Sequence, residues 1–179
     1  MAESAGTSYY RPTDPIGRWL FAISRGLAIL GGVLLSAMAI LASSSIIGRK
    51  LFSAPIPGDV ELMAIGTGLV VFSFLPWCQI TRGNVIVDFI MTKAPTRAKA
   101  FCDTLGALLY VVVGAILTWR LIYGGIDMYK YNEVSITVGF PRWTTFPVSV
   151  LMMAFLVVVT IYTVWRSIAE MRAGRFFDE

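Results

Sequence analysis

The chain has 179 residues, of which 56% are hydrophobic and 15% charged, and its formal net charge is +4. A soluble domain of this length would distribute its charges far more evenly, so the composition argues against one. The basic residues flank long apolar segments instead of forming one patch, which also argues against nucleic-acid binding.

Four segments predict transmembrane helices, because each has a long stretch without charge. No charged residue occurs at positions 26–48, 62–81, 104–119 or 143–165. A hydrocarbon core of ~30 Å needs about 20 apolar helical residues. The third stretch is shorter, so we expect its helix to continue past Arg120, whose side chain would extend to the interface.

The expected fold is therefore an all-α membrane protein that forms a single membrane domain over residues 1–179. We expect the four transmembrane helices at about residues 19–48, 59–81, 103–127 and 143–166.

The N-terminal segment, residues 1–15, is polar and contains two prolines, so we expect a loose cytoplasmic tail. The apolar stretch after it would be a signal peptide if the small residues around Met38 formed a cleavage site. Its length and the 25 residues before it favour a retained helix instead.

Small residues recur at steps of four or eight in three of the expected helices. They are Ala28, Gly32 and Ser36, then Ala64 and Gly68, then Gly106 and Gly114. Such spacing permits two membrane helices to approach closely. The run Gly66-Thr67-Gly68 in the second helix favours close packing in the same way.

The second helix is preceded by the sequence PIPGDVEL, which places two acids at its start. Asp59 is a candidate N-cap. Glu61 falls in the first turn, where the positive end of the helix dipole favours a carboxylate. Arg120 is expected on the same side of the membrane and is a candidate partner for Glu61.

The loop between the second and third helices predicts a short amphipathic helix at residues 84–94, lying on the membrane surface and ending before Pro95. Asp88 would point away from its apolar face. That face consists of Val85, Ile86, Phe89 and Ile90. The alternative is a β-like apolar run within a loop, because short apolar runs are ambiguous.

The distribution of lysine and arginine predicts the orientation of the chain. Ten basic residues lie on the side of the two termini and the middle loop, and five lie on the opposite side. The positive-inside rule then places both termini in the cytoplasm. All five tryptophans fall near the expected helix ends, where the membrane interface favours them.

The residue types needed for several chemistries are missing. There is no histidine, which argues against histidine-ligated haem or metal and against histidine acid–base catalysis. Cys78 and Cys102 have no CxxC spacing, so we expect them to pack as small apolar residues. Nucleotide-binding loops, a nucleophile elbow and paired carboxylates within a span are also absent. We expect no catalytic, substrate-binding or metal site, no cofactor in this chain, and no enzymatic activity.

The segment before the fourth helix is rich in aromatic residues and carries Pro141 and Pro147. Pro147 falls in the first turns of the helix, where a missing N–H costs little. The segment is either a loop anchored at the membrane interface or a contact surface for another protein.

Four motifs in order, PGDVEL, RGNVIVDFI, SITVGFPRW and FPVSV, resemble the small membrane subunit (DctQ-like) of TRAP transporters, the tripartite ATP-independent periplasmic transporters. The resemblance covers roughly residues 19–166. Family members often carry a histidine just before the Ile-x-Val-Asp segment, where this chain has Asn84 and Val85.

The resemblance implies a small scaffold subunit of a sodium-coupled secondary transporter in the bacterial inner membrane. Its partners would be a large multi-helix membrane subunit, which holds the sodium and substrate sites, a periplasmic substrate-binding protein that delivers an organic acid or similar solute, and membrane lipids. By position, the residues that match the family motifs are Glu61, Arg82, Asp88, Pro141 and Trp143.

Three basic residues are added to these from their expected outward location: Arg49, Lys50 and Arg142. They would contact an acidic binding protein or the phosphates of the outer leaflet. With Arg120, the full set of expected contact residues is Arg49, Lys50, Glu61, Arg82, Asp88, Arg120, Pro141, Arg142 and Trp143. The alternative function is a self-sufficient four-helix exporter that uses Glu61 as its proton-coupled acid. A cytochrome-type subunit is disfavoured by the missing ligands.

Overall fold

The computed structural model describes residues 14–53, 56–81 and 96–173, without the side chains of 96–103 and 170–173. These residues form the helices α1 (Pro15–Phe52), α2 (Asp59–Ile80), α4 (Thr96–Lys130) and α5 (Thr145–Ala173), and the short 3₁₀ helix η1 (Arg142–Thr144). Within this part of the chain there is no β-sheet, only an isolated bridge between Val134 and Pro141. Among the described residues, four helices are long and apolar enough to cross a membrane, which confirms the predicted number.

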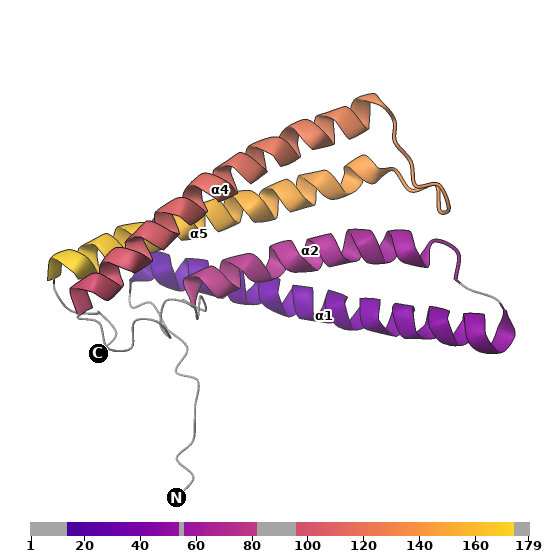
Figure 1. Cartoon of the computed structure of the whole chain (residues 1–179), viewed down its shortest axis with the longest axis horizontal. Coiled ribbons are helices and arrows are strands. Elements are labelled where there is room, and N and C mark those ends of the chain that lie inside the picture. Colours follow the sequence, from indigo (N-terminus) through magenta and orange to yellow (C-terminus); the bar gives the residue numbers. More distant parts are fainter. Residues whose placement is uncertain (1–13, 54–55, 82–95, 174–179) are drawn as a thin grey trace, which may run out of the picture.

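The helices form two antiparallel hairpins, α1–α2 and α4–α5, that meet where α2 packs against α5 (Figure 1). The hairpins lie close together at the end where α1 begins and α5 ends. They diverge toward the opposite end, where residues 53–58 connect α1 to α2 and residues 131–141 connect α4 to η1. This second end is called the loop end below.

Glycines allow α1 and α2 to pack closely, and one of them, Gly66, was among the positions expected to do so. A Cβ atom at Gly31 would lie 2.9 Å from Ser73 Cβ, and one at Gly66 would overlap the Met38 side chain. The predicted positions Gly32 and Gly68 meet nothing within 4 Å. One residue along an α-helix turns the side chain by about 100°, so on α1 the predicted stripe with Gly32 lies on a different face from Gly31, which meets α2.

In the hairpin α4–α5, one of the two glycines predicted to allow close helix packing does so. A Cβ atom at Gly114 would lie 3.3 Å from Val157 Cγ2, whereas one at Gly106 would meet nothing within 4 Å. Pro147 lies in the first turn of α5, as predicted, and η1 leads directly into that turn.

The core lies along α5. Most of the large buried apolar side chains that the structure describes belong to this helix, namely Met153, Leu156, Val159 and Tyr162. Toward the end remote from the loops, the α2–α5 contact is polar: Gln79 Nε2 donates a hydrogen bond of 3.0 Å to Thr163 Oγ1. Interhelical hydrogen bonds of this kind contribute to helix association in membranes.

The remaining helices expose their apolar side chains. Large hydrophobic residues such as Leu30, Ile40, Leu109 and Trp119 are more than half exposed on α1 and α4. A bilayer or another membrane protein would cover such faces. Cys78 is also exposed, so the expectation that it packs in the interior was wrong. The expected surface helix at 84–94 lies outside the described residues and stays a prediction.

Candidate functional site

The connection between α4 and η1 folds into a short hairpin that backbone hydrogen bonds close. Ser135 N–H donates to the carbonyl of Phe140 (2.9 Å), and Arg142 N–H donates to that of Glu133 (3.1 Å). Gly139 has φ of +68°, a conformation that glycine adopts without strain, and its N–H donates to the carbonyl of Ser135 (3.0 Å). These hydrogen bonds enclose the tip, residues 136–138.

Glu61, in the first turn of α2, binds this tip. Its Oε2 accepts a hydrogen bond from the Ser135 hydroxyl, and its Oε1 accepts one from the N–H of Ile136 at 3.1 Å. The N–H of Thr137 lies 3.4 Å from Oε2. Hydrogen bonds to a carboxylate are stronger than neutral ones, and successive backbone N–H groups form a natural site for an anion. Glu61 thereby joins the α1–α2 hairpin to the α4–α5 hairpin.

Gly58 makes a second contact with the same tip. It occupies the N-cap position of α2 with φ of +78°. A Cβ atom there would overlap Val138 Cγ2, so the Val138 side chain fills the space that any other residue would need. Gly58, Glu61 and residues 135–138 together are called the clasp.

Asp59 connects α2 to α1 and also accepts a hydrogen bond from the first turn of its own helix. The expectation that it is the N-cap was wrong, because Gly58 holds that position and Asp59 is the first helical residue. Its Oδ1 accepts from the N–H of Val60 at 2.8 Å. Its Oδ2 accepts from the hydroxyl of Ser45, which is buried, and lies 3.4 Å from Arg49 Nη2, whose side chain is 61% exposed. Because exposed ion pairs contribute little, Ser45 is the more important partner.

The structure gives Glu61 different partners from the one expected. Arg120 is exposed on α4, and the hydrogen bonds of the Glu61 carboxylate come from Ser135, Ile136 and Thr137. The predicted pairing of Glu61 with Arg120 is therefore not formed. Residues 135–137 of the loop bind the Glu61 carboxylate, for which Arg120 was the expected partner.

The other expected contact residues fall into four groups. Arg49 and Lys50 are exposed in the last turn of α1. Arg142 and Trp143 begin η1, with Trp143 packed edge-to-face against Tyr129 at a ring distance of 5.4 Å. Pro141 pairs with Val134 at the base of the loop hairpin. Arg82 and Asp88 lie outside the described residues.

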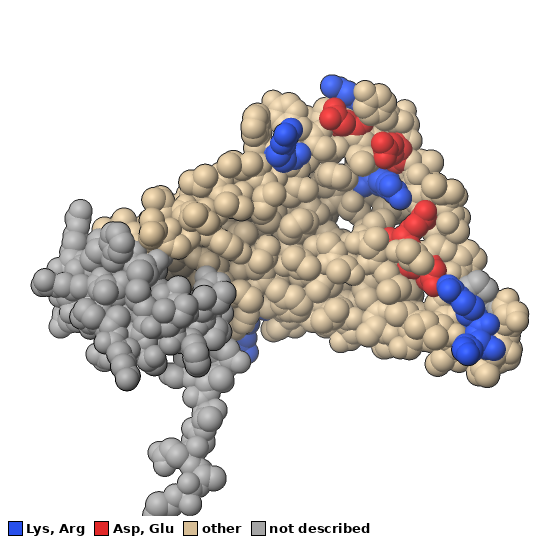
Figure 2. Space-filling view, in the orientation of Figure 1, with Lys and Arg blue, Asp and Glu red and all other residues tan. Residues whose placement is uncertain are grey.

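Among the described residues, most of the charged side chains on the face shown in Figure 2 gather at the loop end. Both acids and bases occur at this end. Arg49 lies in the last turn of α1, and Asp59 and Glu61 lie in the first turn of α2. In the part of the chain that the structure describes, no three His, Cys, Asp or Glu side chains lie close enough to hold a metal ion. What this arrangement can do is hold two hairpins together and present a charged rim.

Sequence reasoning missed the clasp residues Gly58, Ser135 and Val138. Both halves of the clasp lie within motifs that were recognised, PGDVEL and SITVGFPRW. The motifs were treated separately, and nothing in their spacing indicates that one binds the other.

Four apolar helices with charged loops define a multi-pass membrane protein. The family model described as "Tripartite ATP-independent periplasmic transporters, DctQ component" matches residues 38–170, a range that includes the whole clasp. The chain belongs to this family, the small membrane component of TRAP transporters. A search of curated proteins and a search of solved structures found no match.

Proposed function

We propose that this chain is a scaffold that supports the large transport subunit of a sodium-coupled uptake system and does not itself bind the solute. The observation that carries the proposal is the set of hydrogen bonds that the Glu61 carboxylate accepts. This carboxylate is the acid best placed to serve an ion or a substrate, yet three donors of the chain's own loop occupy it. A carboxylate with these hydrogen bonds stabilises the contact between the two helical hairpins.

The partners follow from the family. A tripartite transporter contains a large membrane subunit and a periplasmic binding protein besides the small component. We assign the sodium ions and the solute, an organic acid or a similar compound, to those partners. We assign no cofactor and no catalysis to this chain.

The orientation rests on the bias of basic residues. Both termini would lie in the cytoplasm of a bacterium, with the protein in the inner membrane and the loop end in the periplasm. Arg49, Lys50 and Arg142 then form a basic rim on the periplasmic side. Such a rim suits transient contact with an acidic binding protein, since charges at an interface edge act mainly on association rate.

The alternative, a self-sufficient exporter, requires a carboxylate that is free to exchange protons within a span. Glu61 lies at a helix end and is hydrogen-bonded to a loop, so the geometry does not favour this role.

Co-purification tests the scaffold directly. The tagged chain, extracted from its native membrane in mild detergent, should bring with it a larger multi-helix membrane protein in equal amount. Recovery only as a monomer or a homodimer would overturn the proposal. A haem absorption band in the purified protein would do so as well.

A further inference from the structure

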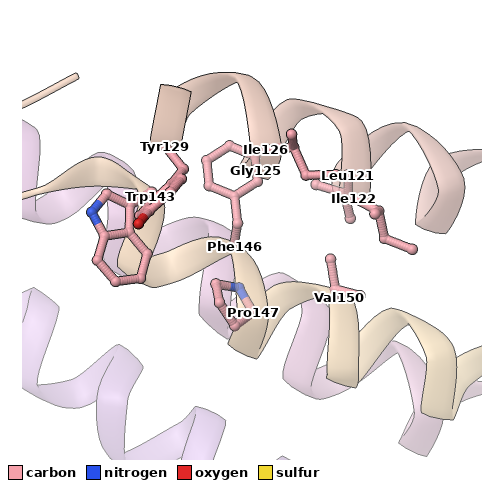
Figure 3. A pocket seen from close by; sticks show the side chains of 9 residues that line it. All are labelled: Leu121, Ile122, Gly125, Ile126, Tyr129, Trp143, Phe146, Pro147 and Val150. Carbon is pink, nitrogen blue, oxygen red and sulfur yellow. The ribbon is translucent and has the colours of Figure 1, made fainter. Parts of the chain in front are cut away.

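An apolar pocket of about 310 Å³ opens between α4 and α5 near the loop end (Figure 3). Leu121, Ile122 and Ile126 of α4 line one side, and Phe146, Pro147 and Val150 of α5 line the other. The volume is about ten times the ~30 Å³ that one water molecule takes up in the liquid. The pocket therefore has room for a run of several methylene groups.

At the base of this pocket, two glycines of α4 allow Phe146 of α5 to pack against the α4 backbone. A Cβ atom at Gly125 would lie 2.9 Å from Phe146 Cβ, and one at Gly124 would lie 3.2 Å from Phe146 Cε1. The Phe146 ring thus rests directly on the α4 backbone. An apolar cavity of this kind does not attract water, because water needs polar partners to replace its lost hydrogen bonds.

The pocket has a defined depth in the membrane. One end is bounded by Tyr129 and Trp143, which pack edge-to-face (Figure 3). Tyrosine and tryptophan favour the boundary between headgroups and hydrocarbon. The other lining residues lie deeper within the two spans, 104–130 and 142–169. At this depth the hydrocarbon tails of the bilayer are the lipid groups that can enter the pocket.

Charged residues adjoin the two aromatic residues in the sequence. Lys130 directly follows Tyr129, and Arg142 directly precedes Trp143. Cations at headgroup level interact favourably with lipid phosphate. The acids Asp127 and Glu133 lie in the same part of the chain, so the headgroup region carries both signs of charge. This combination suits a zwitterionic phospholipid, whose phosphate and ammonium groups each find an opposite charge.

We propose that the pocket is a specific phospholipid site: one acyl chain enters between α4 and α5, and the phosphate lies at Arg142 and Lys130. The lipid comes from the leaflet at the loop end. Its chain fills the groove that α4 and α5 form beside Phe146, and so stabilises the α4–α5 hairpin. The proposal does not depend on the scaffold function.

The test uses the full-length chain in mild detergent, with any membrane partner that co-purifies, and counts bound phospholipids by native mass spectrometry. Val150→Phe fills the pocket. Val158→Phe is the matched control, since Val158 is 52% exposed on the same helix and does not line the pocket. Wild type and Val158→Phe should retain a single phospholipid through washing, and Val150→Phe should lose it. Added phosphatidylethanolamine should raise the unfolding temperature of the first two proteins and leave that of Val150→Phe unchanged.

A second pair of variants tests the contact with the phospholipid headgroup. Arg142→Gln should lower lipid retention several-fold, whereas Lys50→Gln at the end of α1 should not. Equal retention by Val150→Phe and wild type would overturn the proposal. So would a wild type without bound lipid in which Val150→Phe instead weakens binding of a partner protein, because a protein side chain would then be the occupant.

Discussion

The carboxylate of Glu61 accepts a hydrogen bond from the hydroxyl of Ser135, a residue 74 positions further along the chain. This contact joins the first turn of α2 to the loop before α5, at the end where the two hairpins otherwise diverge. It follows that the distance between the hairpins at the loop end depends on a few side chains.

Removing the Glu61 carboxylate should loosen the two hairpins. Glu61→Ala leaves the buried Ser135 hydroxyl and two N–H groups without their acceptor, and hydrogen bonds to a charged group are worth about 1.5–3 kcal/mol. We expect a lower unfolding temperature in detergent and weaker recovery of the large subunit. Glu133→Gln is the control, because Glu133 is exposed on the same loop. Equal effects of the two substitutions would show that the clasp contributes neither to the stability of the chain nor to binding of the large subunit.

Gly58→Ala should be more harmful than Gly139→Ala. Both glycines have positive φ, so each alanine introduces left-handed strain of roughly 1–2 kcal/mol. At Gly58 the new methyl group also overlaps Val138, whereas at Gly139 it meets nothing within 4 Å. Both variants carry the left-handed backbone strain, but only Gly58→Ala also has the steric clash with Val138. The difference between their unfolding temperatures therefore measures the effect of the clash. Val138→Ala should partly rescue Gly58→Ala and should not rescue Gly139→Ala.

Gly31 and Gly32 offer a comparison between adjacent positions on α1. Replacement of either by leucine raises helix propensity by a similar amount, up to about 1 kcal/mol. Only Gly31→Leu places a side chain against Ser73 of α2. We expect Gly31→Leu to lower the unfolding temperature and Gly32→Leu to leave it unchanged or raise it. The reverse order would mean that α2 packs on the other face of α1.

The hydroxyl of Ser45 should matter more than the guanidinium of Arg49 for the α1–α2 connection. Ser45 is buried and donates to Asp59, while the Arg49 side chain is largely exposed and gains little from its ion pair. Ser45→Ala should therefore lower the unfolding temperature more than Arg49→Gln. The small effect of Arg49→Gln should vanish in high salt, because screening removes exposed ion pairs first.

The four spans and the position of Pro147 could be predicted because apolar length and the tolerance of proline in a first turn are local properties. The face of α1 that meets α2 could not, since Gly31 and Gly32 look alike until the neighbouring helix is placed. The partner of Glu61 was missed for a similar reason. An acid at a helix start is expected from the helix dipole alone, and the loop that binds it becomes its neighbour only after both hairpins have formed.

Reconstituted transport tests the central claim that this chain is a scaffold. Vesicles containing the chain together with its large subunit, supplied with the binding protein and solute, should take up the solute when a sodium gradient is imposed. Vesicles containing the chain alone should take up none, under either a sodium or a proton gradient. Ion-coupled transport by the chain alone, abolished by Glu61→Gln, would contradict the account.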